Sequence, residues 1–131
     1  MKYLLDINLL IAAGHTAHSH HGKAMAWIQS VRNKAALFCT CAITELGFVR
    51  VSVQSGLQYD VAAARKALTA LKASSPVRFE MLADALGTDR LPAFAKTPDR
   101  LTDGHLLVLA DANGAELVTF DKGVPGAVLL T

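Results

Sequence analysis

Residues 1–12, MKYLLDINLLIA, decide the fold of this chain. The short apolar run at residues 3–5 is typical of a buried strand, and it ends abruptly at Asp6. Asn8 and a second apolar run follow, as at the start of a helix. Ligands of an open α/β sheet bind at the carboxyl ends of its strands. We therefore expect Asp6 to point at whatever binds, and we interpret it as the first of several acids around a metal ion.

A length of 131 residues indicates one domain over residues 1–131, and 52% hydrophobic residues are ample for its core. The net charge of +2 argues neither for nor against nucleic acid. Lys2 and the apolar residues after it superficially resemble a signal peptide, but Asp6 and Asn8 interrupt them and no second basic residue precedes them. No stretch approaches the length of a membrane span. We expect a cytoplasmic protein without membrane contact.

The two cysteines, Cys39 and Cys41, are too close in sequence for an ordinary disulfide, and they lie in an apolar stretch. We expect both thiols to be reduced and buried, as is usual for a cytosolic protein.

Helical and strand-like patterns alternate along the rest of the chain. Spacing and capping residues predict helices over residues 9–13 with Gly14 as a left-handed C-cap, over about 19–32, and after the caps Thr40, Asp60 and Thr102. Short apolar runs predict strands at residues 35–39, 77–81, 116–121 and 127–130. Residues 83–87 are expected to form a helical turn or two, and residues 88–100 a loop that is rich in basic residues.

Residues 42–54 admit two interpretations. Valines alternate with polar residues from 49 to 53, and this period of two favours a strand. Ala42, Leu46, Val49 and Val53 equally form a helical stripe, so periodicity alone does not decide. We predict a helix, because a helix continues from Thr40 and preserves the alternation. The whole pattern predicts one α/β domain with a mostly parallel sheet.

Four acids fall where such a sheet would gather them. Asp6 and Asp121 end apolar strands, Asp103 opens an apolar helix, and Glu45 lies early in the helix after another strand. Carboxylates so close together repel one another unless a cation is present. Oxygen ligands without His or Cys favour Mg²⁺ or Mn²⁺, and such a site suits phosphodiester hydrolysis.

Each acid also has a purely structural interpretation. Asp103 could favour the helix dipole, Asp121 could be a turn residue, and Glu45 could be a solvated helix acid. Asp6 is the hardest to explain in this way, because a charge between two apolar residues needs a partner.

Together the motifs resemble the PIN-domain ribonucleases, and among them the chain is similar to the VapC toxins of bacterial type II toxin–antitoxin operons. The resemblance rests on the LLDINLL opening around Asp6 and Asn8, on Glu45, on the LTD run ending at Asp103, and on the TFD run ending at Asp121. These motifs cover essentially the whole chain in the family's order and approximate spacing. The resemblance implies a PIN-like three-layer α/β/α domain.

The resemblance also implies a Mg²⁺- or Mn²⁺-dependent endoribonuclease. Asp6, Glu45, Asp103 and Asp121 match the family's acidic quartet, with Asp6 and Asp103 as the firmest metal ligands. Glu45 would bind metal through water or orient the nucleophile, and Asp121 is the position that varies most. Asn8, Thr119 and Thr102 match supporting polar positions. The family further implies a homodimer, which assembles into a larger complex with a small antitoxin whose C-terminal segment blocks the acidic pocket.

A basic surround fits this expectation. Without the four pocket acids, seven acidic residues remain against 13 Lys and Arg. Such a rim suits an RNA backbone, with Arg90, Lys96, Arg100 and Lys122 as candidate phosphate contacts. The alternative for each of them is an ordinary solvated charge.

Histidines offer a second metal hypothesis. Four of them lie in the polar stretch between residues 15 and 22, which leads into the second predicted helix, at His15, His18, His20 and His21. No Cys or acid lies beside them, so we interpret them as surface residues and helix start. His105 points roughly 200° away from Asp103 around their shared helix, which argues against a joint role. Trp27 lies on an apolar helix face and is expected in the core.

Two other classes of function remain open. A phosphatase of the haloacid dehalogenase type requires Asp-x-Asp at the first strand, and Asn8 occupies the place of the second Asp. Receiver domains need paired acids at that strand end and a separate phospho-accepting Asp, which we do not find here. A non-catalytic module that binds RNA or protein could also keep this fold.

Overall fold

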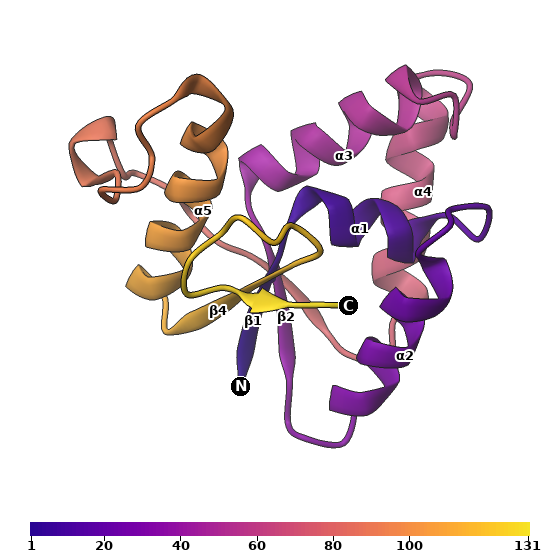
Figure 1. The fold of residues 1–131 in the computed structure, drawn as a ribbon. Coiled ribbons are helices and arrows are strands. Elements are labelled where there is room, and N and C mark those ends of the chain that lie inside the picture. The colour runs from indigo at the N-terminus through magenta and orange to yellow at the C-terminus, as the bar shows by residue number, and fades with distance from the viewer.

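A five-stranded parallel sheet forms the centre of the computed structural model, which describes residues 1–131 (Figure 1). Its strand order is β3-β2-β1-β4-β5. The strands are β1 (Lys2–Leu5), β2 (Leu37–Thr40), β3 (Phe79–Met81), β4 (Ala115–Thr119) and β5 (Val128–Leu129). The helices are α1 (Ile7–Gly14), α2 (His21–Val31), α3 (Ala42–Gln54), α4 (Val61–Ser74) and α5 (Leu101–Ala112), with 3₁₀ turns η1 (Thr88–Arg90) and η2 (Pro98–Arg100).

Alternating side chains of the strands build two separate cores. From β1, Tyr3 and Leu5 join a cluster with residues of α1, α2, α3 and α4, whereas Leu4 joins a cluster with residues of α5. Helices therefore cover both faces of the sheet, and the three-layer α/β/α arrangement is confirmed. Trp27 packs in the first core, stacked on Phe38 at a centroid distance of 5.3 Å, as expected. No helix has the length and apolar character needed to cross a membrane.

The topology creates a crevice beside β1. From β1 the chain proceeds to β2 and β3 on one side, and it later returns to β4 on the other side. β1 pairs in parallel with both β2 and β4. Such a reversal of strand order is where open α/β sheets bind ligands, at the carboxyl ends of the strands. Asp6 directly follows β1, so the acid of the opening motif lies at this point.

Several predicted elements are confirmed. Residues 42–54 form α3, which decides the strand-or-helix question for helix. Asp60 is the N-cap of α4 and accepts a hydrogen bond of 2.8 Å from the Ala63 amide. Cys39 and Cys41 are buried free thiols.

Two predicted caps were wrong. Thr40 ends β2, and Cys41 is the N-cap of α3, because the Thr40 hydroxyl donates to Glu45 while Thr44 accepts from the Cys41 amide. Thr102 lies inside α5, because the 3₁₀ turn that starts at Pro98 brings the chain into helical geometry before it.

Two further predictions were wrong. Gly14 is not a left-handed C-cap, because α1 runs through it and ends at His15 in extended backbone. A Cβ at Gly14 would lie 2.9 Å from Phe48, so close packing accounts for this glycine. Residues 83–87 form no helical turn, because the Asp84 side chain accepts from the Leu86 amide and pairs with His105.

Candidate active site

The Asp6 carboxylate is buried, with 4% of the residue exposed, and hydrogen bonds fix both of its oxygens. Oδ1 accepts from the Ile7 amide over 2.8 Å, at the start of α1. Oδ2 accepts from the Thr119 hydroxyl over 2.7 Å, at the end of β4. A buried charge needs such partners, and here they also set the direction of the carboxylate.

Asn8 and Thr119 connect the start of α1 to the end of β4. The Asn8 amide donates to Thr119 Oγ1 over 3.0 Å, and its carbonyl accepts from the Phe120 amide over 3.1 Å. Thr119 Oγ1 also accepts from the Asp121 amide over 3.0 Å. The two residues that we expected to support the acids therefore orient the backbone of Asp121 as well as the side chain of Asp6.

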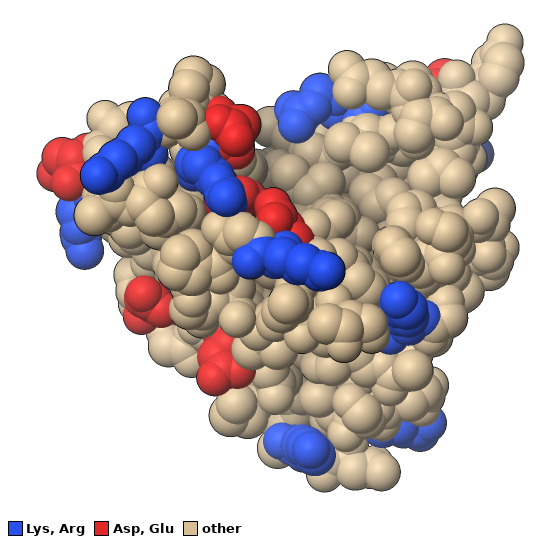
Figure 2. Space-filling view, viewed as in Figure 1, with Lys and Arg blue, Asp and Glu red and all other residues tan.

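Three of the four predicted acids line one pocket of about 330 Å³: Asp6, Asp103 and Asp121. They come from the junction of β1 and α1, from the first turn of α5, and from the loop after β4. The other residues lining the pocket are Ile7, Asn8, Ile11, His18, Val51 and Thr102. Figure 2 shows acidic side chains gathered in a hollow between the lobe that carries α5 and the body formed by α1 and α3.

The pocket holds more negative charge than its own cations balance. Burial, followed by repulsion from Asp6 and Asp121, raises the pKa of Asp103 to about 6. Burial also raises the pKa of Asp6, against the lowering effect of its bonds to Thr119 and Ile7. The nearest opposing charge is Arg100, with Nη1 3.9 Å from Asp103 Oδ2. A bound cation would relieve this repulsion.

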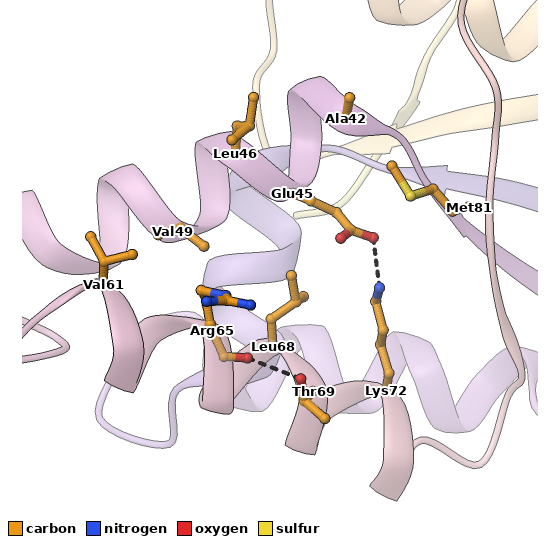
Figure 3. A pocket seen from close by; sticks show the side chains of 10 residues that line it. All are labelled: Ala42, Glu45, Leu46, Val49, Val61, Arg65, Leu68, Thr69, Lys72 and Met81. Carbon is orange, nitrogen blue, oxygen red and sulfur yellow. Dashed lines mark hydrogen bonds and ion pairs between the residues drawn. The ribbon is translucent and has the colours of Figure 1, made fainter.

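Glu45 is not in this pocket, contrary to our expectation that the four acids would meet. Its Oε2 accepts from Lys72 Nζ over 2.6 Å and from the Thr40 hydroxyl over 2.5 Å. Figure 3 shows Glu45 pointing from α3 toward Lys72 on α4, into a separate pocket of about 560 Å³. Lys72 therefore supplies the positive charge that balances the Glu45 carboxylate. The sequence contains no signal for this pair, which is 27 residues apart on two helices.

No three His, Cys, Asp or Glu side chains lie close enough together to form a ready-made metal site. The donor chemistry nevertheless fits a hard divalent cation, since the pocket offers carboxylate oxygens and no thiol. Asp103 accepts no hydrogen bond, which leaves its oxygens available. Asp6, Asp103 and Asp121 are the residues that could hold such an ion.

The predicted basic residues take two kinds of position. Arg90, Lys96 and Lys122 are exposed. Arg100 is half-buried, donates to the Gly123 carbonyl and lies beside Asp103, so its charge faces one acid of the pocket although it does not line the pocket itself. Thr102 also lines the pocket and is exposed there.

The prediction of surface positions and a helix start is confirmed for His20, which is exposed, and for His21, which begins α2, but it is wrong for His15. His15 is buried, stacks on Phe48, and its Nδ1 bonds to the Ile11 carbonyl over 2.8 Å, because the loop folds back over α1. His21 bonds to the Ala12 carbonyl, and His20 stacks on Phe120. His105 pairs with Asp84 away from the pocket, as expected.

His18 lines the acidic pocket, whereas we expected a surface residue of the loop at this position. The residue lies 12 positions after Asp6, in the loop between α1 and α2. His18 lies near the acids only because that loop folds back over α1, and no local sequence pattern predicts this path.

Curated relatives cover nearly the whole chain, although no protein-family model matches it. Ribonuclease VapC38 of Mycobacterium tuberculosis is 40% identical over 126 residues, which are 92% of this chain and 86% of that protein. Ribonuclease VapC44 of the same species is 33% identical over 139 residues, covering 97% and 94%.

Solved structures share the fold at low sequence identity. VapC20 of M. tuberculosis, described as a sarcin–ricin loop cleaving toxin, superposes with a TM-score of 0.65 at 17% identity over 96% of each chain. PAE2754 of Pyrobaculum aerophilum gives a TM-score of 0.63 at 23% identity, covering 98% and 88%. VapBC2 of Rickettsia felis, bound to promoter DNA, gives 0.62 at 16% identity, covering 98% and 97%.

Proposed function

We propose, from the premise that this chain belongs to the VapC family of ribonucleases, that the pocket of Asp6, Asp103 and Asp121 is where it cleaves RNA. Membership of this family makes the protein an endoribonuclease, the toxin of a VapBC-type pair, with RNA as substrate and an antitoxin protein as partner. The pocket is the part of the molecule whose chemistry suits that activity.

One observation carries the proposal for the site. Three carboxylates from three separate segments converge, and their mutual repulsion contributes to a pKa of about 6 for Asp103. A protein maintains such repulsion at a cost in stability, and ligand sites are where such costs are commonly found. We propose that Mg²⁺ or Mn²⁺ occupies this pocket. When bound, the ion would act as a Lewis acid on the phosphodiester and lower the pKa of water.

The protein's own groups hold the geometry. Asp6 has both oxygens fixed by Thr119 and the Ile7 amide, so it keeps one direction whether or not a ligand is present. Asp103 accepts no hydrogen bond and is free to turn toward a ligand. Arg100, held by the Gly123 carbonyl, limits the repulsion at Asp103 before substrate arrives.

Glu45 has a secondary role in this proposal. It lies in the first turn of α3 at the same edge of the sheet, but Lys72 and Thr40 bind its carboxylate. We infer that Glu45 acts on the metal or on water only after it leaves Lys72. Its contribution to metal affinity is therefore smaller than that of Asp103.

Exposed cations are proposed to receive the RNA backbone. Arg90, Lys96 and Lys122 are free of ion pairs and lie on the segments before and after α5. Neutralising several phosphates in this way makes binding weaken steeply with salt. We also propose a cytoplasmic homodimer, which associates with the antitoxin.

The decisive experiment compares two acids of α5. A structured RNA is incubated with the wild type, with Asp103→Asn and with Asp111→Asn, in Mg²⁺ or Mn²⁺ and in EDTA. Asp111 is exposed at the other end of the helix, so its variant controls for the loss of one charge. We expect cleavage by the wild type and by Asp111→Asn only, none in EDTA, and products with 5′-phosphates.

Two outcomes would contradict the proposal. Cleavage by Asp103→Asn at the wild-type rate would remove the pocket as the active site. RNA binding without cleavage by any form would indicate a non-catalytic module.

A further inference from the structure

The ring of His18 lies in the wall of the acidic pocket, and the backbone holds it there. The His18 amide donates to the His15 carbonyl and the His18 carbonyl accepts from the His21 amide, each over 3.0 Å. The loop between α1 and α2 is therefore a hydrogen-bonded turn. Its position gives His18 access to the same space as Asp6, Asp103 and Asp121.

A backbone contact selects the tautomer of His18. The His20 amide donates to His18 Nδ1 over 3.0 Å, so Nδ1 must carry a lone pair. In neutral imidazole the other nitrogen then carries the hydrogen. Burial, and to a smaller degree the neighbouring His20, His15 and His21, lower the pKa of His18 below its ordinary value. The ring thus presents an Nε2–H donor without a positive charge.

Few side chains that line the pocket have a hydrogen-bond donor without an acceptor in the protein. Asn8 donates to Thr119 and accepts from the Phe120 amide, and no ion pair or hydrogen bond joins His18 Nε2 to a carboxylate. His18 and Thr102 are the polar lining residues whose side chains donate to nothing in the protein, whereas Asn8 uses one of its two N–H groups on Thr119. A phosphodiester that enters among three carboxylates needs donors for its non-bridging oxygens.

We propose that His18 is a substrate-positioning residue, whose Nε2–H donates to a non-bridging oxygen of an RNA phosphate in the acidic pocket. This inference rests on the proposed function, because it assumes that RNA enters there. The fixed tautomer argues against His18 as a metal ligand, since ligation through Nε2 requires the lone pair that this tautomer lacks and would sacrifice the bond from His20. A neutral donor also leaves the carboxylates free to attract a cation.

The test uses two variants and one matched control. His18→Phe keeps a flat ring without the donor, and His18→Gln keeps an amide donor at similar reach. Ser19→Ala removes an exposed side chain from the same loop and is the control. KM and kcat are measured with structured RNA, and the Kd for Mn²⁺ is measured by calorimetry without RNA. Kd for RNA is also measured by fluorescence anisotropy in an Asp103→Asn background, where cleavage does not occur.

We expect His18→Phe to raise KM, and to weaken RNA binding in the Asp103→Asn background, by roughly tenfold or more, the effect of one hydrogen bond to a charged group. We expect His18→Gln to recover most of this loss, and Ser19→Ala to match the wild type. The Mn²⁺ affinity should be unchanged in all three.

Three results would overturn the inference. The first is unchanged KM and RNA affinity in His18→Phe. The second is a parallel loss of Mn²⁺ affinity, which would make His18 a metal ligand. The third is an equal loss in His18→Gln together with a lowered Tm, which would make the role structural. Because RNA binding is measured separately, a protein that binds RNA through His18 but cleaves nothing would contradict the proposed function alone.

Discussion

The hydroxyl of Thr119 donates a hydrogen bond of 2.7 Å to Asp6 Oδ2, across 113 positions of sequence. This bond joins the end of β4 to the end of β1, at the crevice where the strand order reverses. The same oxygen of Thr119 accepts from Asn8 and from the Asp121 amide. A single buried hydroxyl therefore forms hydrogen bonds with both the first and the last acid of the pocket, with the side chain of Asp6 and the backbone of Asp121.

Replacing Thr119 by valine should damage both stability and cleavage. The change removes the donor to Asp6 at a buried position and leaves the partly buried Asn8 and Asp121 donors without an acceptor. Each unpaired buried polar group costs about 1–3 kcal/mol, so we expect a total loss of at least that size in urea unfolding. Cleavage should fall with it, since Asp6 loses its fixed direction.

Thr119→Ser is the matched control, because it keeps the hydroxyl and removes only a methyl group. We expect it to retain most of the stability and activity. A valine variant that unfolds at the wild-type urea midpoint would refute the role assigned to this bond.

Removing the partner of Glu45 should change metal binding more than stability. Lys72 and Glu45 side chains are 33% and 23% exposed, and pairs of this kind contribute at most about 1 kcal/mol. We expect Lys72→Met to release Glu45 and to tighten Mn²⁺ binding in calorimetry. Glu45→Gln should weaken Mn²⁺ binding less than Asp103→Asn does.

Lys66→Met serves as the control for Lys72→Met, because Lys66 is exposed on the same helix and forms no ion pair. Equal Mn²⁺ affinity in both methionine variants would show that Lys72 does not restrain Glu45.

The stability of the metal-free protein should fall as the pH rises through the pKa of Asp103. The folded pKa is about 6, above the ordinary value of 3.8, so the folded protein binds more protons than the unfolded chain between these values. The favourable contribution of the protonated carboxyl is complete below pH 3.8 and is lost as the pH passes 6. Asp103→Asn removes this loss. In EDTA, the Tm of the variant minus the Tm of the wild type should therefore grow from pH 4 to pH 7.5.

The Asp111→Asn control should follow the wild-type pH profile, because that carboxylate lies outside the pocket. A Tm difference between Asp103→Asn and the wild type that does not vary with pH would contradict the raised pKa.

Added Mn²⁺ should stabilise the wild type more at pH 7.5 than at pH 5. Ligating carboxylates must be deprotonated, and Asp103 is largely protonated at the lower pH. The measurement is the shift in Tm on adding metal at the two pH values. Equal shifts at both values would indicate that Asp103 is not a ligand.

Adding one methyl group at Gly47 should disturb the site through packing. A Cβ there would lie 2.3 Å from Ile7 Cδ1 and 2.7 Å from Ile7 Cγ1, where α1 packs against α3. Overpacking of this kind costs about 1–3 kcal/mol, and Ile7 adjoins Asp6, so we expect Gly47→Ala to lower both stability and cleavage.

Gly22→Ala is the control, because Gly22 lies in α2 with nothing within 4 Å of its Cβ position. This variant should be neutral or gain up to about 1 kcal/mol, as alanine favours a helix more than glycine. Similar losses from both variants would show that close packing of α1 on α3 is not the reason for Gly47.

Local patterns were sufficient to predict the strand–acid–helix unit at Asp6, the alternation of helices and strands, and the meeting of Asp6, Asp103 and Asp121. Each depends on short-range information. Apolar runs identify buried strands, and parallel strands place their carboxyl ends at one edge. The starts of α3 and α5 were predicted less well, because capping depends on which hydroxyl is free, and Thr40 is already bound to Glu45.

Tertiary packing decided the partners of individual side chains. Glu45 turned to Lys72 because α4 packs against α3 and places an ammonium group within 2.6 Å, which no spacing along either helix reveals. His18 joined the pocket because its loop folds back over α1. A sequence can specify where a helix begins and which face it buries. The charge that a flexible side chain finally meets depends on elements far along the chain, and only their packing brings the two together.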